Sequence, residues 1–463
     1  FARQTATAVR LEDLYRWGQG DLSTRLQMAR FLHNEIAVRN AQLCKELCVL
    51  PFGLADTKGV QAVVKGFSSY VDRLAESPRP ETAEDDRRFT EMLRGILEDP
   101  TQVVRTLGCG VTEVREALGE DRYEAIRPEV DHILDRFFIK RIGLRFLLQH
   151  YIEAAESRPG VSGIIHSNVQ VGRILRAEAL EARRLCREIY GEAPDVIVIG
   201  DGEGGDLPSP SRSAGFGSSI YENPNLSYDR QFTYVPTHLR FSCSVLLQNA
   251  CFSVAELFAR KQAFETLPAA ASSGAAPVSS PRKLEMPPVH AIFAYGEEEV
   301  AIKVSDEGGG IPRSKQHLAW SYFGAPVGPS ADEAAAAADA ASAAESPRPS
   351  AGWRHSAPLG AGNPRGAGLP LARLHARYCG GDLTLKSIEG FGTDAHLFLN
   401  RLGHNCENLP HGVRVSPAMR DSSIGEETSF DALGPMTQPE VSFLKRRLSE
   451  FRKESAASVA SLG

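Results

Sequence analysis

The apolar pattern of the chain changes near residue 191, and this change constrains the fold most. Before it, apolar residues recur at spacings of three and four, best within residues 134–154. One stripe there comprises Leu134, Phe137, Phe138, Ile142 and Phe146. A second helical pattern, over residues 171–190, ends at Gly191, a residue type suited to a helix C-terminus. Residues 8–191 are therefore predicted to form an antiparallel helical bundle.

Beyond residue 191 the sequence alternates between strand-like and helical segments. Helical patterns cover residues 232–261 and 369–381. Strand-forming residues fill five segments, namely 193–200, 289–296, 299–306, 382–390 and 393–402. Residues 192–402 are therefore predicted to form an α/β sandwich with one sheet under a helical layer, so the chain as a whole belongs to the α+β class.

Three segments inside the predicted sandwich, and the end of the chain, have a different composition. The three segments are rich in Pro, Ser, Gly and Ala, and they bury too little apolar surface to offset the entropy lost on ordering. We therefore predict inserts near residues 201–231, 267–283 and 327–358, and a C-terminal tail over residues 403–463.

Composition narrows the function classes. The net charge of −6, from 58 acidic and 52 basic residues, argues against a nucleic-acid or polyanion binder. No apolar run reaches the roughly 18 residues of a membrane span. The eight cysteines show neither a CxxC pair nor zinc spacing, which predicts reduced, buried thiols. The chain begins at Phe1 rather than Met, so we expect a fragment or a processed form whose targeting peptide is out of view.

The most distinctive local chemistry is IKVSDEGGGIP, residues 302–312. An apolar strand delivers Asp306, whose carboxylate can accept a hydrogen bond from an exocyclic amine, and Gly308, Gly309 and Gly310 follow. Glycines let a backbone turn tightly and approach a ligand closely. Alone, the motif is a weak signal, because a plain glycine-rich turn explains it more simply.

Further signals follow the order of a nucleotide site. Gly366 and Gly368 precede a helix whose N–H groups and dipole can face phosphates, although no Gly-Lys-Ser/Thr of a P-loop follows. Asn249, on the preceding long helix, offers a neutral oxygen to Mg²⁺. Thr393 opens the last strand with a hydroxyl suited to base recognition. Taken singly, each is better explained as an ordinary loop, helix or turn residue.

Taken together, these elements resemble the N, G1 and G2 boxes of the gyrase/histidine-kinase ATPase superfamily. The segments YVPTHL, VSDEGGGIPRS, GLPLARLHARYCGGDL and GFGTDAHLFLNRL closely resemble the pyruvate dehydrogenase kinases. In the bundle, LPFGLADTKGVQAVVKGFSSYVDRL and LDRFFIKRIGLRFLLQH match the same family. The resemblance covers residues 8–402. Branched-chain ketoacid dehydrogenase kinases form the sister group, and the sequence resembles the pyruvate group more closely.

The resemblance implies a helical bundle followed by an ATP-binding sandwich. It implies transfer of the γ-phosphate of ATP to a serine of the decarboxylase subunit of the mitochondrial pyruvate dehydrogenase complex, which inactivates the complex. The implied partners are that subunit, the lipoyl domain of the acyltransferase core, docked on the bundle, and a second copy of the chain. The implied compartment is the mitochondrial matrix.

By family position, Asn249 holds Mg²⁺, and Asp306 and Thr393 read adenine. The residues implied to line the nucleotide are Gly308, Gly310, Gly366, Ala367, Gly368 and Leu369.

The sequence departs from the family on the helix that carries Asn249. Val245 stands where the family has the glutamate that orients or deprotonates the acceptor hydroxyl, and Phe241 stands where it has a histidine. Gln248 and Phe252 replace a lysine and an arginine. A general base contributes about 10²–10⁴-fold, but phosphoryl transfer relies mainly on positioning and charge stabilisation.

Changes also fall in the lid and the second glycine cluster. The family's Ser-Thr-Ala reads Phe323-Gly324-Ala325, and Pro364 replaces the first glycine of the G2 pattern. Three alternatives remain open: an active kinase, a pseudokinase that docks on or regulates the complex, and an error in the recorded sequence of residues 240–252. A substitute base from Glu256 or Glu265 is less favoured, because Glu256 lies two turns from Asn249. His150 is interpreted as a structural histidine rather than a phospho-acceptor.

Overall fold

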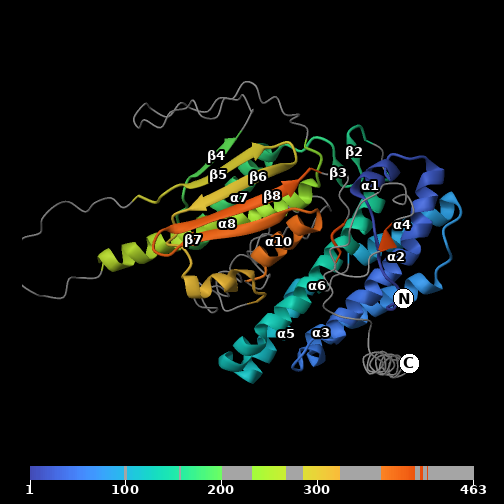
Figure 1. The fold of residues 1–463 in the computed structure, drawn as a ribbon, viewed down its shortest axis with the longest axis horizontal. Helices are drawn as coiled ribbons and strands as arrows, with labels where there is room; N and C mark the ends of the chain where they lie inside the picture. Colours follow the sequence, from blue (N-terminus) through green and yellow to red (C-terminus); the bar gives the residue numbers. More distant parts are fainter. Residues whose placement is uncertain are drawn as a thin grey trace, which may run out of the picture. The chain divides into compact units, whose positions relative to one another are not determined.

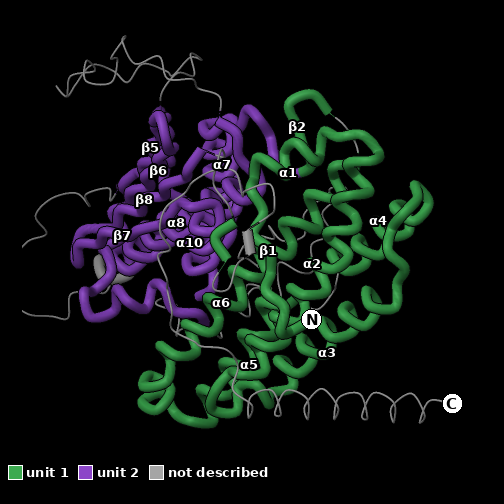
Figure 2. Tube along the Cα trace, turned by 45° about the vertical axis from the view of Figure 1, so that its right-hand side comes forward, with its two compact units in different colours: residues 1–163, 404–463 green, residues 164–403 purple. Residues whose placement is uncertain are grey.

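A computed structural model describes residues 1–98, 102–155, 158–200, 232–266, 285–323, 366–401 and 407–409, together with the backbone of residues 414–415. The chain divides into two compact units (Figure 2). Unit 1 contains residues 1–163 and 404–463, and unit 2 contains residues 164–403.

Unit 1 is built from helices, as predicted for the first part of the chain (Figure 1). Its helices are α1 (Leu11–Trp17), α2 (Leu22–Cys48), the 3-10 helix η1 (Leu54–Asp56), α3 (Lys58–Glu76), α4 (Ala83–Leu97), α5 (Val103–Leu118) and α6 (Glu120–Glu153). Short strands are β1 (Thr7–Ala8), β2 (Val161–Ser162) and β9 (Arg414–Val415), of which β1 and β9 pair in parallel. The predicted apolar stripe lies on α6, and all five of its side chains are buried.

A buried ion-pair network joins the chain after unit 2 to helix α2. The Arg39 guanidinium donates through Nε to Glu35 Oε1 at 2.9 Å. Its Nη1 and Nη2 donate to Glu407 Oε1 at 2.9 Å and Oε2 at 2.7 Å, a two-pronged geometry that suits a guanidinium and a carboxylate. Glu407 also accepts from the Val9 backbone N–H at 2.9 Å. The beginning of the predicted tail is therefore part of unit 1.

Unit 2 contains a five-stranded sheet in the order β4-β5-β6-β8-β7. Its elements are β3 (Ile165–His166), α7 (Val171–Tyr190), β4 (Val196–Gly200), α8 (Pro236–Thr266), β5 (Val289–Tyr295), β6 (Glu299–Asp306), the 3-10 helix η2 (Arg313–Trp320), α10 (Gly368–Tyr378), β7 (Asp382–Ile388) and β8 (Gly392–Asn400). β4 and β5 are parallel, and the other neighbours are antiparallel. Helices α7, α8 and α10 pack on one face (Figure 1), which confirms the predicted α/β sandwich.

The division between the units differs from the predicted boundary between residues 191 and 192. Helix α7 belongs to unit 2, because its apolar side packs along α8. At that contact Cys186 Sγ donates to the Cys251 carbonyl at 3.6 Å, and Arg240 Nη1 donates to Glu178 Oε1 at 2.8 Å. A helical period predicts an amphipathic helix but does not identify its neighbour. The three predicted inserts lie outside the described residues.

Helix α8 is the central helix of unit 2. By length and composition its stretch Pro236–Gln262, with a mean hydropathy of 1.3, could cross a membrane, and 61% of the tested window is buried within the protein. It packs against α7, α10 and the sheet. A helix that is apolar on all sides is what such a central position requires, so its composition follows from its packing.

The described cysteines are free thiols, in agreement with the prediction of reduced cysteines. Cys109 is exposed, and Cys406 lies outside the described residues. The buried thiols are Cys44, Cys48, Cys186, Cys243, Cys251 and Cys379. Burial raises the pKa of the Cys186 thiol to about 11, which makes it a poor nucleophile at neutral pH.

Candidate functional site

Three polar side chains lie in one row at the end of the sheet. Asp306 is the last residue of β6 and pairs with Thr393 of β8, which in turn pairs with Ser387 of β7. Side chains alternate between the two faces of a strand, and Val304 and Ile302, on the same face as Asp306, are buried. The register of the sheet therefore places the two predicted base-reading residues side by side.

Burial disfavours the charged form of the Asp306 carboxylate, although the carboxylate accepts two backbone hydrogen bonds. Its Oδ1 accepts a hydrogen bond from the Gly308 N–H at 2.8 Å, and the Thr393 backbone also donates to it. Burial nevertheless outweighs these bonds and raises the pKa of Asp306 to about 6. A partly desolvated carboxylate gains most from a further donor, such as the amine of a nucleobase.

The glycine loop after Asp306 is held between α8 and the β7–β8 turn. The Gly309 N–H donates to the Phe391 carbonyl at 3.0 Å, and the Gly390 N–H donates to the Gly309 carbonyl at 2.8 Å. Gly310 has φ 68°, and a Cβ there would meet the Ile388 carbonyl oxygen at 2.1 Å. Only glycine satisfies both the conformation and the close approach.

Asn249 lies next to this loop on α8. Its side chain is exposed, and its backbone carbonyl accepts a hydrogen bond from Ser253 Oγ at 2.8 Å. Ser253, one turn further on, lies so near Gly308 that a Cβ on that glycine would meet Ser253 Cβ at 2.4 Å. The structure thus brings Asn249 within a helical turn of the glycine loop that follows Asp306.

The part of the chain that the structure describes contains no group of three or more His, Cys, Asp or Glu residues that could hold a metal ion. The exposed Asn249 side chain offers a neutral oxygen on this side of α8. Mg²⁺ in phosphate sites commonly takes one or two protein ligands and completes its shell with phosphate oxygens and water. An isolated amide oxygen beside a glycine loop is compatible with that mode and not with an all-protein cage.

The substituted positions of α8 have packing roles. Val245 is 2% exposed, and the Phe241 ring contacts that of His375 with a centroid distance of 4.9 Å. Gln248 is 2% exposed and donates to Ser244 Oγ at 2.9 Å. Phe252 packs against Tyr190. This face of α8 is therefore apolar at the positions where the resembled kinases carry base and orienting residues.

Of the acidic residues further along α8, the structure describes the side chain of Glu256 and not that of Glu265. Glu256 forms an i,i+4 ion pair with Arg260. His150 is in unit 1, fully buried, with its Nε2 hydrogen-bonded to the Leu14 carbonyl at 2.9 Å. Burial lowers the pKa of His150 to about 4, which supports its interpretation as a structural residue.

The second glycine cluster opens helix α10. Gly366 has φ 98°, and its carbonyl accepts from the Phe323 N–H at 3.2 Å. Ala367 is buried and precedes Gly368, the first residue of the helix, and Leu369 is half-buried. α10 packs on α8, so its N-terminal N–H groups belong to the same helical layer as Asn249. Gly324, Ala325 and Pro364 lie outside the described residues.

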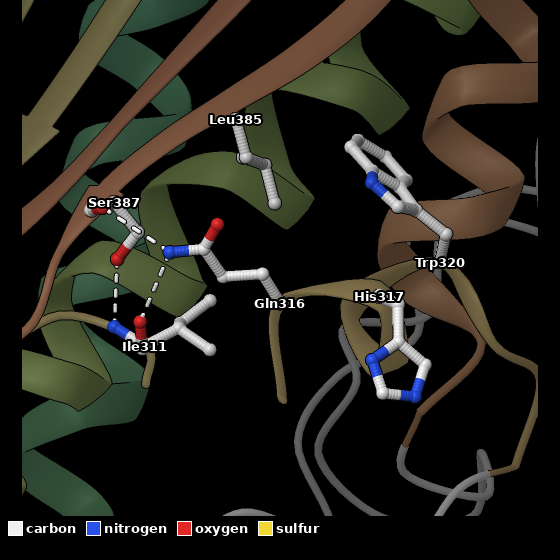
Figure 3. Close-up of a pocket in the computed structure, with 6 residues that line it drawn as sticks. All are labelled: Ile311, Gln316, His317, Trp320, Leu385 and Ser387. Atoms are coloured by element: carbon white, nitrogen blue, oxygen red, sulfur yellow. Dashed lines mark hydrogen bonds between the residues drawn. The ribbon is translucent and has the colours of Figure 1, made fainter. Parts of the chain in front are cut away.

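A pocket of about 200 Å³ adjoins the polar row, and the sequence reasoning missed it (Figure 3). Ser387 Oγ accepts from the Ile311 N–H at 2.6 Å and lies 2.9 Å from Thr393 Oγ1, which connects the pocket to the row. Gln316 Nε2 donates to the carbonyls of Ile311 and Ser387. The lining residues are Ile311, Gln316, His317, Trp320, Leu385 and Ser387. The alternation of residues 382–388 was the one sequence signal for Ser387 and Leu385.

Trp320 forms one wall of the pocket and is held from α10. The Arg373 guanidinium lies over its ring, 4.3 Å from the centroid, and Arg373 Nε donates to Asp382 Oδ1 at 3.1 Å. Such a cation–π contact stabilises the ring orientation by roughly 0.5–1 kcal/mol at an exposed site. The pocket thus combines apolar walls with polar atoms from the β7 strand and η2.

Comparison of the sequence with known proteins shows which family the chain is similar to. Residues 8–166 match the model of the mitochondrial branched-chain alpha-ketoacid dehydrogenase kinase. A mitochondrial pyruvate dehydrogenase (acetyl-transferring) kinase of Arabidopsis thaliana is 30% identical over 419 residues, which cover 86% of this chain and 96% of the relative. The human isozyme 4 is 26% identical over 422 residues, covering 89% and 85%. The chain belongs to the pyruvate dehydrogenase kinase family.

Proposed function

We propose that this chain is an ATP-dependent protein-serine kinase that phosphorylates the decarboxylase subunit of the mitochondrial pyruvate dehydrogenase complex and so inactivates it. The observation that carries the proposal is the row of Asp306, Thr393 and Ser387 beside the glycine loop, in a chain similar over most of its length to kinases with that name. The row supplies what an adenine base requires: a carboxylate, two hydroxyls and an adjoining apolar pocket.

The nucleotide roles follow from the positions of the residues. Asp306 accepts a hydrogen bond from the exocyclic amine of adenine, and Thr393 bonds the ring beside it. Ile311 and Leu385 offer apolar surface to the base. The nucleotide is lined by Gly308, Gly310, Gly366, Ala367, Gly368 and Leu369. The free N–H groups at the start of α10 stabilise phosphate charge.

Bound Mg²⁺ would neutralise charge on the phosphates, and Asn249 is the residue that would hold it. In the transfer, the acceptor serine oxygen forms a bond to the γ-phosphorus, the bond between that phosphorus and the β–γ bridging oxygen breaks, and the hydroxyl proton passes to water. ADP is the leaving group. Val245 cannot take the proton, so this chain contributes to the reaction by binding and orientation.

A second candidate is a pseudokinase that binds nucleotide and acts as a docking or regulatory module on the same complex. The observation in its favour is the apolar face of α8, where Val245 is 2% exposed and Phe241 packs on a neighbouring ring. Loss of the base together with two cations leaves the developing phosphate charge less compensated. The retained Asp306 row supports nucleotide binding in both candidates.

The implied partners are part of the proposal. The helical unit 1 is proposed to dock the lipoyl domain of the acyltransferase core. A homodimer is proposed through the sheet face that the helices leave open, because Ile197, Ile199 and Ile292 are exposed there. The relatives are named as mitochondrial, and the mitochondrial matrix is the proposed compartment. The net charge of −6 argues against a nucleic-acid partner.

Calorimetric titration of the purified chain with ATP·Mg²⁺, followed in the same sample by phosphate transfer to the decarboxylase subunit, tests both candidates. Binding with transfer is the result expected of the kinase. Binding without transfer would replace the kinase with the pseudokinase. No binding would contradict the nucleotide roles given to Asp306, Thr393 and Asn249.

A further inference from the structure

The side chain of Gln316 is held in one orientation by its amide nitrogen. Gln316 Nε2 donates to the Ile311 carbonyl at 3.3 Å and to the Ser387 carbonyl at 3.2 Å. A carbonyl oxygen accepts but cannot donate, so turning the amide over would lose both hydrogen bonds. Figure 3 shows the amide nitrogen directed at these two residues and the amide oxygen pointing away from them. The two bonds thus leave Gln316 Oε1 as a fixed acceptor.

This acceptor faces the pocket without a protein partner. Among the residues that the structure describes, none donates a hydrogen bond to Gln316 Oε1. The side chain is half-buried and lines the pocket of about 200 Å³, in which Leu385 and Trp320 provide apolar walls. Because its orientation is already set by the protein, Oε1 can accept from a ligand N–H group at little further cost in ordering.

Gln316 also adjoins the polar row of the sheet. Along that row Asp306 pairs with Thr393, and Thr393 pairs with Ser387, whose carbonyl holds Gln316. The Ser387 hydroxyl is already engaged, because it accepts from the Ile311 N–H at 2.6 Å and lies 2.9 Å from Thr393 Oγ1. The row therefore has an acceptor at each end, the Asp306 carboxylate at one and Gln316 Oε1 at the other.

The proposed base contacts define which edge of adenine runs along the row. The exocyclic amine on C6 meets Asp306, and the ring nitrogen beside it meets Thr393. Since N7 belongs to the ring that carries the ribose, the nitrogen that follows on the side away from the ribose is N1, and the next atom along that edge is C2. In adenine C2 carries only hydrogen, so ATP placed this way leaves Gln316 Oε1 unbonded.

We propose that Gln316 determines the specificity of this site at C2 of the purine, so that a nucleoside triphosphate with amines at both C6 and C2 binds more tightly than ATP. The inference rests on the proposed nucleotide binding. The C6 amine donates to Asp306, and the C2 amine donates to Gln316 Oε1. Guanine has the C2 amine but carries a carbonyl oxygen at C6, which would place acceptor against acceptor at Asp306.

The test compares analogues that differ only at C2. The full chain is titrated by calorimetry with the Mg²⁺ complexes of ATP, 2-aminoadenosine triphosphate, 2-methyladenosine triphosphate and GTP. A methyl group has nearly the size of an amine but covers the acceptor without bonding it, so we expect the 2-amino analogue to bind about three- to tenfold more tightly than the 2-methyl analogue. It should also bind more tightly than ATP, and GTP should bind at least about tenfold more weakly than the 2-amino analogue.

A variant removes the acceptor itself. Gln316→Leu keeps a side chain of similar size without Oε1, so the 2-amino and 2-methyl analogues should bind it equally, or the methyl compound more tightly. Ser314→Leu is the matched control, because it places the same side chain at an exposed position of η2, and it should keep the preference. Each comparison is made between two ligands on one protein, so an effect of the substitution on stability cancels.

The outcomes separate this inference from the proposed function. If the parent chain binds the 2-amino and 2-methyl analogues equally, the inference is overturned, and this comparison decides even where Gln316→Leu does not fold. A preference that persists in Gln316→Leu overturns it as well. In both cases ATP binding stands. If neither ATP nor any analogue binds, the nucleotide roles of Asp306 and Thr393 are wrong, and this inference falls with them.

Discussion

The two ends of the candidate site differ in the side chains that they offer. At the sheet end, Asp306 and Thr393 remain, and Ser387 links them to a pocket. On α8, the positions that would serve the acceptor hydroxyl are Val245 and Phe241, both engaged in packing. Because the two ends are built on different elements, the side chains at one end can change without disturbing the other. We therefore expect nucleotide binding and phosphate transfer to be separable properties of this chain.

The physical reason for the difference is the density of backbone contacts at each end. At the sheet end, a Cβ on Gly392 would meet the Asp306 carbonyl oxygen at 1.9 Å, and one on Gly310 would meet the Ile388 carbonyl oxygen at 2.1 Å. Substitution there disturbs the sheet itself. On α8, the side chains alone differ, and apolar residues such as Val245 pack well between helices. The fold does not require a catalytic side chain at that position.

Removing the carboxylate of Asp306 should have the largest effect. Asp306→Ala deletes the charged acceptor for the base, and we expect ATP binding to weaken by about 10- to 100-fold, because a hydrogen bond to a charged group contributes about 1.5–3 kcal/mol. Calorimetry measures the change. Glu307→Ala is the matched control, since Glu307 is the adjacent, exposed acid. If Asp306→Ala bound ATP as tightly as the parent chain, the assignment of Asp306 to the adenine base would be wrong.

Placing an acidic group and an imidazole on α8 tests the other end of the site and should increase phosphate transfer. Val245→Glu with Phe241→His should raise phosphate transfer by about 10- to 100-fold, at or below the lower part of the range of general-base catalysis. Val245→Gln with Phe241→His is the control, because it has nearly the same shape and no base. No gain in the glutamate variant would mean that the lid and cation losses dominate, or that the role is not catalytic.

A methyl group in the glycine loop should damage the base end without touching α8. Gly310→Ala forces a positive φ on a residue with a Cβ and crowds the Ile388 carbonyl, so we expect a loss of about 2–3 kcal/mol in the free energy of unfolding. Gly390→Ala has a similar φ of 83° but no atom within 4 Å, so it should cost only about 1 kcal/mol of strain. Thermal melting compares them, and equal losses would contradict the close approach.

Acidic pH should weaken the base end selectively. Burial raises the pKa of Asp306 to about 6, so the carboxyl group becomes protonated below that pH and no longer accepts from the adenine amine as an anion. ATP affinity should then fall by about tenfold between pH 7 and pH 5. In the ligand-free protein the sign is opposite: between about pH 4 and 6 the folded state keeps a proton that the unfolded state has lost, so stability decreases as pH rises.

Asp306→Asn cannot titrate and serves as the control for both pH effects. Its ATP affinity and melting temperature should lack the component that changes near pH 6. A parent chain whose ATP affinity stays constant from pH 7 to pH 5 would show that Asp306 is either solvated or not in contact with the base.

The smallest expected effect comes from Ser387. Ser387→Ala removes the acceptor for the Ile311 N–H and the link to Thr393, and it should weaken ATP binding by about three- to tenfold, the cost of roughly 1 kcal/mol for a neutral hydrogen bond. Ser305→Ala, on strand β6 and outside the row, is the control. Equal effects of the two substitutions would show that the hydroxyl has no specific part in the row.

Much of unit 2 could be predicted from the sequence, because its strands and helices carry strong local patterns. All five strand segments are confirmed, and the register places Asp306 opposite Thr393. The sequence did not reveal that α7 belongs to unit 2, since an amphipathic period does not identify the partner helix. It also missed Gln316 and Trp320, whose roles depend on the path of η2 over β7. The contact of His375 with Phe241 depends on an interface between helices about 130 residues apart in sequence, which no local pattern encodes.

The buried network around Arg39 has a consequence for the order of synthesis. Glu407 is the partner that neutralises a guanidinium with only 2% of its side chain exposed, and it leaves the ribosome after the whole of unit 2. Until then, helix α2 carries a cation whose one buried carboxylate neighbour in this network is Glu35. A chain that ended at residue 401 would retain every strand of the five-stranded sheet and still lack the group that completes the helical unit. The helices of unit 1 are thus synthesised first, but the ion pair between Arg39 and Glu407 forms only after unit 2 has been synthesised.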